Sequence, residues 1–269
     1  MKKIGFVGAG NMAGALVKGL IETRRLRPPE LWVSDTDARQ RRRLRRAYGV
    51  AAADDNRALV AGSAVVVLAV KPQIMDAVLA EIRPVATRRQ LFVSIAAGVP
   101  TRRIEAALGG SVRVVRAMPN TPALVGSGMT VLVRGRRASL ADERRATALF
   151  GGVGAVVRVR DEKLMDAVTG LSGSGPAYVY RLAEGLIAGA TAEGLSATVA
   201  AALTYQTIRG AAVMLQETGR PPEELRAMVT SPGGTTLAGL QTLDAGGFAK
   251  TVAAAVRAAT RRSRQLGRG

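Results

Sequence analysis

The chain contains no cysteine and no histidine among its 269 residues. Without cysteine there are no disulfides and no thiol chemistry. Without histidine there is no imidazole acid–base catalysis, no histidine-dependent triad and almost no way to build a zinc site. We therefore predict no metal site, and we expect any proton transfer to depend on Asp, Glu, Lys, Tyr, a hydroxyl group or water.

The chain also lacks any apolar run that approaches the roughly 20 residues of a membrane-spanning helix. Lys2 and Lys3 precede an apolar stretch, as in a signal peptide, but glycines and Asn11 interrupt that stretch. We therefore expect a cytoplasmic protein without a membrane partner. Hydrophobic residues make up 48% of the chain, which is ample for the core of one large domain or two ordinary ones.

Aromatic residues are scarce, at 3%, and the 20 acidic residues are outnumbered by 39 basic ones. The net charge of +19 raises the alternative of a nucleic-acid-binding protein, and nine arginines lie between Arg24 and Arg46. Such a protein would normally add a recognisable module or stacking aromatics, and the sequence shows neither. We interpret the charge as an arginine-rich solvated surface and predict no specific nucleic-acid partner, although non-specific polyanion binding stays open as a side effect.

The most informative feature at the N-terminus is a glycine-rich turn. Ile4–Val7 is an apolar run typical of a buried parallel strand. Residues 8–13, GAGNMA, follow it as G-x-G-x-x-A, the pattern that dinucleotide-binding proteins place between a strand and a helix. Gly10 leaves room for a pyrophosphate, and the N–H groups of the following helix favour its charge. The alternative is a merely structural turn, but the context favours a dinucleotide.

Apolar periodicity divides the chain near residue 160. The first part predicts strands at 31–34, 65–70, 91–95, 112–116 and 129–133, and helices at 12–24, 37–48, 73–82 and 101–108. The second part predicts helices at 175–194, 196–218, 221–229, 235–245 and 247–266. The alternation in the first part predicts an α/β fold with a parallel sheet between two layers of helices.

We therefore predict a Rossmann-like dinucleotide-binding domain at 1–161 and an all-helical domain at 162–269. Several of the C-terminal helices are apolar over more than one face, which indicates packing against another subunit. This pattern predicts that the helical domain forms a homodimer.

Ligands of open α/β sheets bind beyond the carboxyl ends of the strands. Lys71 and Asn120 each come shortly after a predicted strand, and small residues at 96–98 would let a flat nicotinamide approach the backbone. Lys71 is either a ligand-facing lysine or a solvated one. Asn120 either contacts the cofactor or bonds its own turn.

The most informative feature near the C-terminus is Ser231–Thr236, SPGGTT, ahead of a predicted helix. Two glycines before a helix N-terminus expose unpaired N–H groups, which is typical of an anion site with a hydroxyl beside it. The structural alternative is a helix start capped by threonine. A further small-residue segment at 172–176, SGSGP, either lines a pocket or permits close helix packing.

Several longer stretches resemble pyrroline-5-carboxylate reductases, and the similarity covers essentially the whole chain. The matching stretches are IGFVGAGNMA at 4–13, VVVLAVKPQ at 65–73, VSIAAGVP at 93–100, VVRAMPNTPALVGSGMT at 114–130, AVTGLSGSGPAYVY at 167–180 and VTSPGGTTLAGL at 229–240. The resemblance implies a Rossmann-like domain joined to a helical dimerisation domain, in an enzyme of proline biosynthesis that reduces 1-pyrroline-5-carboxylate to L-proline with NADPH or NADH. It also implies intertwined dimers, often assembled into larger rings.

Carried over by position, the resemblance implies two sets of site residues. Cofactor contacts are expected at Val7, Gly8, Ala9, Gly10, Asn11, Met12, Ser34, Asn56, Ala69, Val70, Lys71, Pro72, Ile95, Ala96 and Ala97. Substrate contacts are expected at Ser231, Gly233, Gly234, Thr235 and Thr236, with Thr236 nearest the imine nitrogen as the catalytic residue. From their positions in the sequence alone, Asn120 is added as a cofactor contact and Ser174 as a substrate contact, with the alternatives given above. The chain departs from the family at Pro221-Pro222, where many relatives have His-Pro, and Glu217 matches a neighbouring acidic residue only approximately.

The chemistry agrees with the residue inventory, because a protonated C=N bond accepts a hydride with little acid catalysis. One rival is a β-hydroxyacid dehydrogenase, which would place a lysine and an asparagine in the first long C-terminal helix, and 175–194 contains neither. The other is a cofactor-binding regulator without turnover. For cofactor choice, Asp35 favours NADH, whereas Arg39, Arg42 and Arg43 nearby favour the 2′-phosphate of NADPH, which we predict.

Overall fold

A computed structural model describes residues 3–267, and packing divides it into two compact units. One unit comprises the chain up to Ser174 together with the segment from Arg257, and the other comprises Gly175–Val256. The domain boundary after Asp161 stays a prediction, since packing groups residues 162–174 with the first unit.

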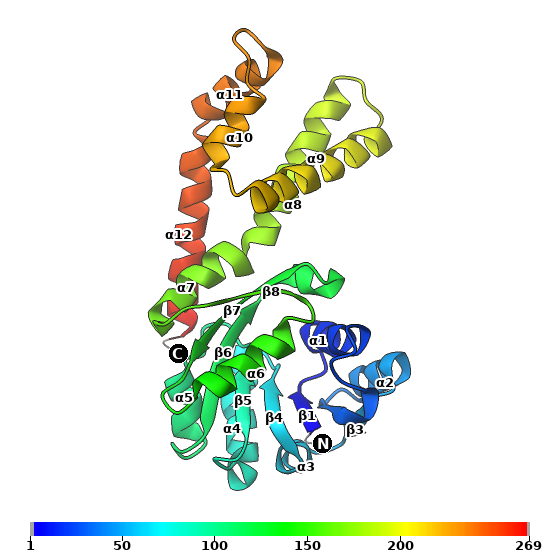
Figure 1. The fold of residues 1–269 in the computed structure, drawn as a ribbon, viewed down its shortest axis with the longest axis vertical. Helices are drawn as coiled ribbons and strands as arrows, with labels where there is room; N and C mark the ends of the chain where they lie inside the picture. Colours follow the sequence, from blue (N-terminus) through cyan, green and yellow to red (C-terminus); the bar gives the residue numbers. More distant parts are fainter. Residues whose placement is uncertain (1–2, 268–269) are drawn as a thin grey trace. The chain divides into compact units, whose positions relative to one another are not determined.

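The first unit is built on an eight-stranded sheet with the order β3-β2-β1-β4-β5-β6-β7-β8 (Figure 1). The strands are β1 Lys3–Val7, β2 Leu31–Ser34, β3 Ala51–Ala53, β4 Ser63–Leu68, β5 Leu91–Ser94, β6 Arg113–Pro119, β7 Gly128–Arg134 and β8 Gly154–Arg158. Strands β1 to β6 are parallel, whereas β7 runs antiparallel to β6 and β8 follows β7 in parallel. The reversal corrects the expectation of a parallel sheet throughout. Its cause is the short β6–β7 connection, because a parallel crossover needs a dozen or more residues.

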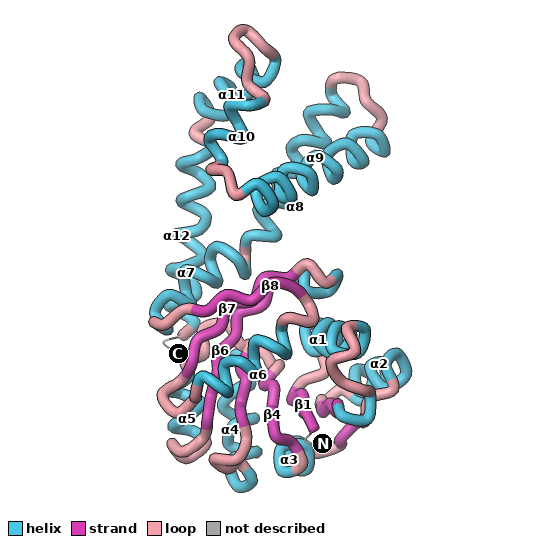
Figure 2. The backbone as a smooth tube through the Cα atoms, viewed as in Figure 1, coloured by secondary structure: helices cyan, strands magenta, loops and turns pink. Residues whose placement is uncertain are grey.

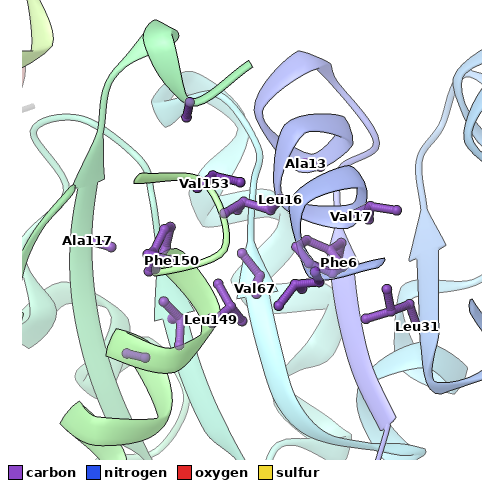
Figure 3. Close-up of a cluster of buried hydrophobic side chains, with 14 of the residues drawn as sticks. Phe6, Ala13, Leu16, Val17, Leu31, Val67, Ala117, Leu149, Phe150 and Val153 are labelled. Carbon is purple, nitrogen blue, oxygen red and sulfur yellow. The ribbon is translucent and has the colours of Figure 1, made fainter. Parts of the chain in front are cut away.

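Helices cover both faces of this sheet, as predicted. They are α1 Asn11–Glu22, α2 Ala38–Tyr48, α3 Asn56–Ala61, α4 Met75–Ile82, α5 Thr101–Ala107, α6 Leu140–Phe150 and α7 Met165–Val168. On one face Phe6 of β1 and Val67 of β4 pack with Leu16 of α1 and Phe150 of α6 (Figure 3). A separate cluster fills the other face under α3, α4 and α5. These two apolar layers hold the carboxyl ends of the strands in place.

Strands β3 and β8 and helices α3, α6 and α7 were not predicted from the sequence. Strand β8 carries mostly exposed or half-exposed side chains, so it lacks the apolar run of a buried strand. Helix α6 begins with a capping box, in which Ser139 and Asp142 bond each other's backbone N–H groups. This signal was available in the sequence and would have identified the helix.

The second unit is helical throughout (Figure 2). It contains α8 Gly175–Ala192, α9 Ala197–Thr218, α10 Pro222–Met228, α11 Thr235–Ala245 and the first part of α12 Phe248–Leu266. Each predicted C-terminal helix is confirmed within two residues at either end. Across residues 3–267, no helix has both the length and the apolar character that crossing a membrane requires.

Candidate functional site

The glycine-rich turn connects β1 to α1 at the carboxyl edge of the sheet. Gly8 has φ +101°, and a Cβ there would lie 2.6 Å from the carbonyl oxygen of Ala69, so only glycine fits. Gly10 is the N-cap of α1, and a Cβ on Gly10 would meet no atom within 4 Å. The N-cap makes no side-chain bond, so the first N–H groups of α1 remain available for an anion.

Asp35 and Arg43 hold the middle of this turn from both sides. The backbone N–H of Ala9 donates to Asp35 Oδ2 at 2.8 Å, and Arg43 Nη2 donates to the Ala9 carbonyl at 3.0 Å. Asp35 Oδ1 also accepts from the backbone N–H of Asp37 at 2.9 Å. Both carboxylate oxygens of Asp35 are therefore already bonded to backbone, which leaves them less available to a ribose hydroxyl.

The other arginines near this turn have different tasks. Arg41 donates to the Asp35 carbonyl and pairs with Asp54 at 2.9 Å. Arg39 pairs with Asp37, the N-cap of α2. The backbone N–H and then the side chain of Arg39 hold the pKa of Asp37 below its ordinary value. The charge of Arg39 is thus already paired with a carboxylate, whereas among the described residues Arg43 bonds only the neutral Ala9 carbonyl, so Arg42 and Arg43 are the better candidates for a 2′-phosphate.

Ser34 and Asn56, both expected cofactor residues, bond each other. Ser34 Oγ donates to Asn56 Oδ1 at 2.6 Å, and Asn56 Nδ2 donates to Glu81 Oε2 at 2.8 Å. Glu81 was not among the expected site residues, because no sequence pattern marks it. The chain of bonds orients Asn56 at the carboxyl end of β2.

The loops after β4 and β5 complete the same edge. The backbone N–H of Ala69 donates to Val7, and that of Ile95 donates to Leu68, so each loop leaves its strand beside the preceding one. The expected contacts Ala69–Pro72 and Ile95–Ala97 lie in these loops. Lys71 is exposed. The structure thus brings the expected cofactor residues that follow β1, β2, β4 and β5 to one edge of the sheet, together with Asn56.

Asn120 has a strong structural role. Its Oδ1 accepts from the backbone N–H of Met129 at 2.8 Å, and its Nδ2 lies 3.3 Å from the carbonyl oxygen of Ser172. The side chain therefore ties the start of β7 to the segment before α8. A cofactor contact at Asn120 stays a prediction, with the amide oxygen already occupied.

The segment before α8 is a wide helical turn. Thr169–Gly173 is a π-helical turn, and Ser174 N–H donates to the Thr169 carbonyl at 2.9 Å. A Cβ on Gly173 would lie 2.6 Å from Met118 Cε, so the glycine permits close packing on β6. Such π turns often lie at functional sites. Ser174 is half-buried and stays a predicted substrate contact.

The Ser231–Thr236 loop forms the start of α11 in the second unit. Gly234 N–H donates to the Ser231 carbonyl at 3.0 Å, and Gly233 has φ +69° at the third position of this turn, where glycine is required. Gly234 is the N-cap and makes no side-chain bond. The threonine cap of the structural alternative is therefore not what is observed.

This geometry changes one detail of the expected substrate site. The Gly234 N–H is used within the turn, so it is not available to a carboxylate. Among the described residues, the N–H groups of Thr235, Thr236 and Leu237 have no recorded partner at the start of the helix. Leu237 is a donor that the sequence analysis missed. Thr236 is half-buried, whereas Thr235 is exposed.

Two family models match the chain. The model for pyrroline-5-carboxylate reductase dimerisation matches residues 162–266, and the model for NADP oxidoreductase, coenzyme F420-dependent, matches residues 3–98. The chain is 42% identical to a pyrroline-5-carboxylate reductase of Methanosarcina acetivorans, over 99% of this chain and 98% of that one. It is 41% identical to the enzyme of Glycine max, over 98% and 95%.

Solved structures agree with these sequence relatives. A pyrroline-5-carboxylate reductase from Coxiella burnetii superposes with a TM-score of 0.92 at 37% identity, covering 98% of each chain. The Plasmodium falciparum enzyme, solved with NADP bound, gives 0.90 at 32% identity, covering 99% and 98%. A 3-hydroxyisobutyrate dehydrogenase from Mycobacterium tuberculosis gives only 0.52 at 17% identity over 82% of this chain and 72% of that one, a likeness of fold alone.

Proposed function

The chain belongs to the pyrroline-5-carboxylate reductase family, and we propose on this premise how its residues reduce 1-pyrroline-5-carboxylate to L-proline with NADPH. The enzyme is an NAD(P)H-dependent oxidoreductase that acts on a C=N bond in proline biosynthesis. The observation that carries the proposal is the open space above Gly10 at the N-terminus of α1, in a chain that matches its relatives from end to end. A cytoplasmic location stays a prediction.

In the cofactor site, the N–H groups at the start of α1 hold a pyrophosphate. Asp35 and Arg43 keep Ala9 in position for this task through the bonds described above. Ala97 is small and only half-buried, which would let a flat ring approach the backbone there, whereas the side chain of Ala96 is buried in the core. When bound, NADPH supplies the hydride, and the protein contributes position and electrostatics.

In the substrate site, the N-terminus of α11 holds the carboxylate of the imine. The free N–H groups of Thr235, Thr236 and Leu237 and the positive end of the helix favour a negative charge. The hydroxyl of Thr236 bonds the ring nitrogen, whose charge changes as the hydride arrives at carbon. No histidine or cysteine is needed for this chemistry.

The reductase reading is tested by NADPH oxidation with and without 1-pyrroline-5-carboxylate. We expect oxidation only in the presence of the imine, with L-proline formed in equal amount. Cofactor binding without turnover would instead favour a regulatory protein.

We predict a preference for NADPH that depends on Arg43. Replacing Arg43 by alanine removes a guanidinium beside the glycine turn, and a bond to a charged group contributes about 1.5–3 kcal/mol, so the KM for NADPH should rise roughly ten- to hundredfold. The KM for NADH should rise less, because NADH has no 2′-phosphate and loses only the support that Arg43 gives the turn through the Ala9 carbonyl. Arg46→Ala on the same helix is the matched control. A wild-type enzyme with higher kcat/KM for NADH would contradict this prediction.

The second unit supports a dimer, because its helices expose large apolar side chains along their length. Among the described residues of α8 and α9, only Ala183, Ala200 and Thr204 are buried. Leu186 on α8, Leu203 on α9 and Met228 on α10 are between 44% and 60% exposed. A second copy of the chain would cover this surface. Assembly of dimers into a larger ring stays a prediction.

Subunit complementation tests whether one active site uses two chains. A Gly10→Ala chain and a Thr236→Ala chain should each lose most of their activity as homodimers. Because hydride transfer requires cofactor and imine in contact, the mixed dimer should recover part of the activity if different chains supply the two sites. Full activity of a monomer at assay concentration would refute the obligate dimer.

A further inference from the structure

A cavity of about 640 Å³ in the first unit lies beside the loop that follows β5. Its wall includes Gly98 and Pro100 of that loop, the segment Asp161–Lys163, and Arg264 and Gly267 at the end of α12. Gly98 and Gly267 are neighbours, since a Cβ on Gly98 would lie 3.2 Å from the Gly267 nitrogen. Apart from Gly98, which belongs to the small-residue segment 96–98 expected beside the nicotinamide, none of the expected site residues lines this cavity.

Three exposed cations on the wall have no recorded partner among the described residues. Arg102, Lys163 and Arg264 all line the cavity, and none of their side chains forms a recorded ion pair or hydrogen bond within residues 3–267. The three carboxylates on the same wall accept hydrogen bonds that restrain them but keep their charge, so four cations and three anions leave the wall with one net positive charge. Asp161 accepts from the backbone N–H of Lys163 at 2.9 Å, and Asp166 accepts from Ser263 at 2.7 Å.

Arg116 adds a buried positive charge to this wall. Its side chain is only 5% exposed, and its single recorded bond joins Nη1 to Glu162 Oε1 at 3.3 Å. Nε and Nη2 are buried without a partner in the described part of the chain. Arg116 is not the sole donor to Glu162, because this carboxylate also accepts from the N–H and the hydroxyl of Thr101 at 2.8 and 2.7 Å. The buried guanidinium is therefore only partly compensated, which is costly without a further anion nearby.

We propose that this cavity binds a phosphate group, free or carried by a small metabolite. The three unpaired cations line one cavity, and guanidinium and ammonium groups both bind phosphate oxygens. The buried charge of Arg116 strengthens the positive field in the cavity, because it is only partly screened. The cavity has room for more than inorganic phosphate alone.

The position of the cavity predicts an effect on the cofactor, and this consequence rests on the proposed function. Gly98 directly follows Ile95–Ala97, the expected cofactor contacts, and Pro100 lies two residues further along the same loop. A ligand that orders this loop in advance should lower the KM for the cofactor, because less ordering remains for the cofactor itself. Binding of phosphate does not depend on this consequence.

Isothermal titration of the full-length protein with inorganic phosphate and with glycerol 3-phosphate tests the proposal. The buffer is phosphate-free and low in salt, since salt screens exposed charges. Lys163→Ala/Arg264→Ala should weaken binding about tenfold or more, as two bonds to a charged ligand are lost. Arg144→Ala/Arg261→Ala removes the same charge from exposed helix positions outside the cavity and should bind as the wild type does.

A variant at the cofactor turn separates this cavity from the proposed 2′-phosphate site. Binding that survives Lys163→Ala/Arg264→Ala but is lost in Arg43→Ala would place phosphate at the cofactor turn and overturn the proposal. Equal loss in the Arg144→Ala/Arg261→Ala control, or no binding by the wild type, would also overturn it. Tighter binding of glycerol 3-phosphate than of inorganic phosphate would identify a metabolite as the ligand, and the reverse would identify the free ion.

Kinetics with NADH give a second readout, because NADH has no 2′-phosphate that free phosphate could displace. Phosphate should lower the KM for NADH about twofold or more in the wild type and leave it unchanged in Lys163→Ala/Arg264→Ala. A protein that binds phosphate but does not reduce the imine would refute the proposed function and leave the binding site in place.

Discussion

Replacing Gly10 by alanine is expected to abolish tight NADPH binding while the protein keeps its wild-type thermal stability. A Cβ at this position meets nothing within 4 Å in the structure, and Gly10 has φ −69°, which alanine adopts without strain. The methyl group would fill the space that the pyrophosphate needs. Losing two charge-assisted bonds from the start of α1 costs about 3 kcal/mol or more, which raises the Kd for NADPH roughly a hundredfold or more.

Gly8→Ala is the matched comparison, because it changes the same turn for a different physical reason. At φ +101° a side chain costs about 1–2 kcal/mol, and the new methyl group would also press on the Ala69 carbonyl. Each kcal/mol lowers Tm by roughly 2–4 °C in a unit of this size. Calorimetry and NADPH titration of both variants are the measurements. Unchanged NADPH affinity in a folded Gly10→Ala protein would remove the glycine turn from the cofactor site.

Replacing Thr236 by alanine should lower kcat/KM for the imine roughly ten- to hundredfold. The change removes one hydroxyl that bonds the ring nitrogen, and bonds to charged groups contribute about 1.5–3 kcal/mol. The turn that precedes α11 should persist, because Gly234 N–H and the Ser231 carbonyl close it. Steady-state kinetics with both substrates measure the effect, and the Kd for NADPH should barely change.

Thr235→Ala serves as the control for the side chain. We assign Thr235 a role through its backbone N–H only, so Thr235→Ala should lower kcat/KM less than Thr236→Ala does. Wild-type turnover and an unchanged KM in Thr236→Ala would show that the hydroxyl has no catalytic task. The reductase activity would survive that outcome, because the N–H groups that bind the carboxylate belong to the backbone.

Local patterns were sufficient for most of the fold. The strand at Leu31–Ser34 and the helix at Thr235–Ala245 occur where periodicity and end signals predict them. Each of these two elements is specified by the structural preferences of a few neighbouring residues. The elements that were not predicted also have a physical explanation. Strand Ala51–Ala53 has no β-branched or aromatic residue, so only its pairing with β2 makes it a strand.

The expected site residues show the same division. G-x-G-x-x-A identifies the turn from its backbone requirements alone, since a glycine at φ +101° is a local necessity. The partners of that turn are distant in sequence: Asp35 lies 26 residues from Ala9, and Arg43 lies 34 residues from it. Sequence spacing could not show that both carboxylate oxygens of Asp35 accept backbone N–H groups. Asp35 is therefore a weaker argument for binding NADH than its sequence position suggests.

The sequence by itself determined the α/β and helical halves, the glycine-rich turn, the Ser231–Thr236 loop and the family, because these depend on short-range preferences and on motifs. Only the tertiary structure decided that β7 runs antiparallel to β6 and that the Asn120 side chain accepts a hydrogen bond from the backbone of Met129. It also decided that the Gly234 N–H is bonded within a turn. It also decided that Arg116 is buried with two nitrogens unpartnered. The reason is that whether a donor or acceptor is left unpaired depends on which distant groups folding brings within hydrogen-bonding distance, and no local pattern specifies that.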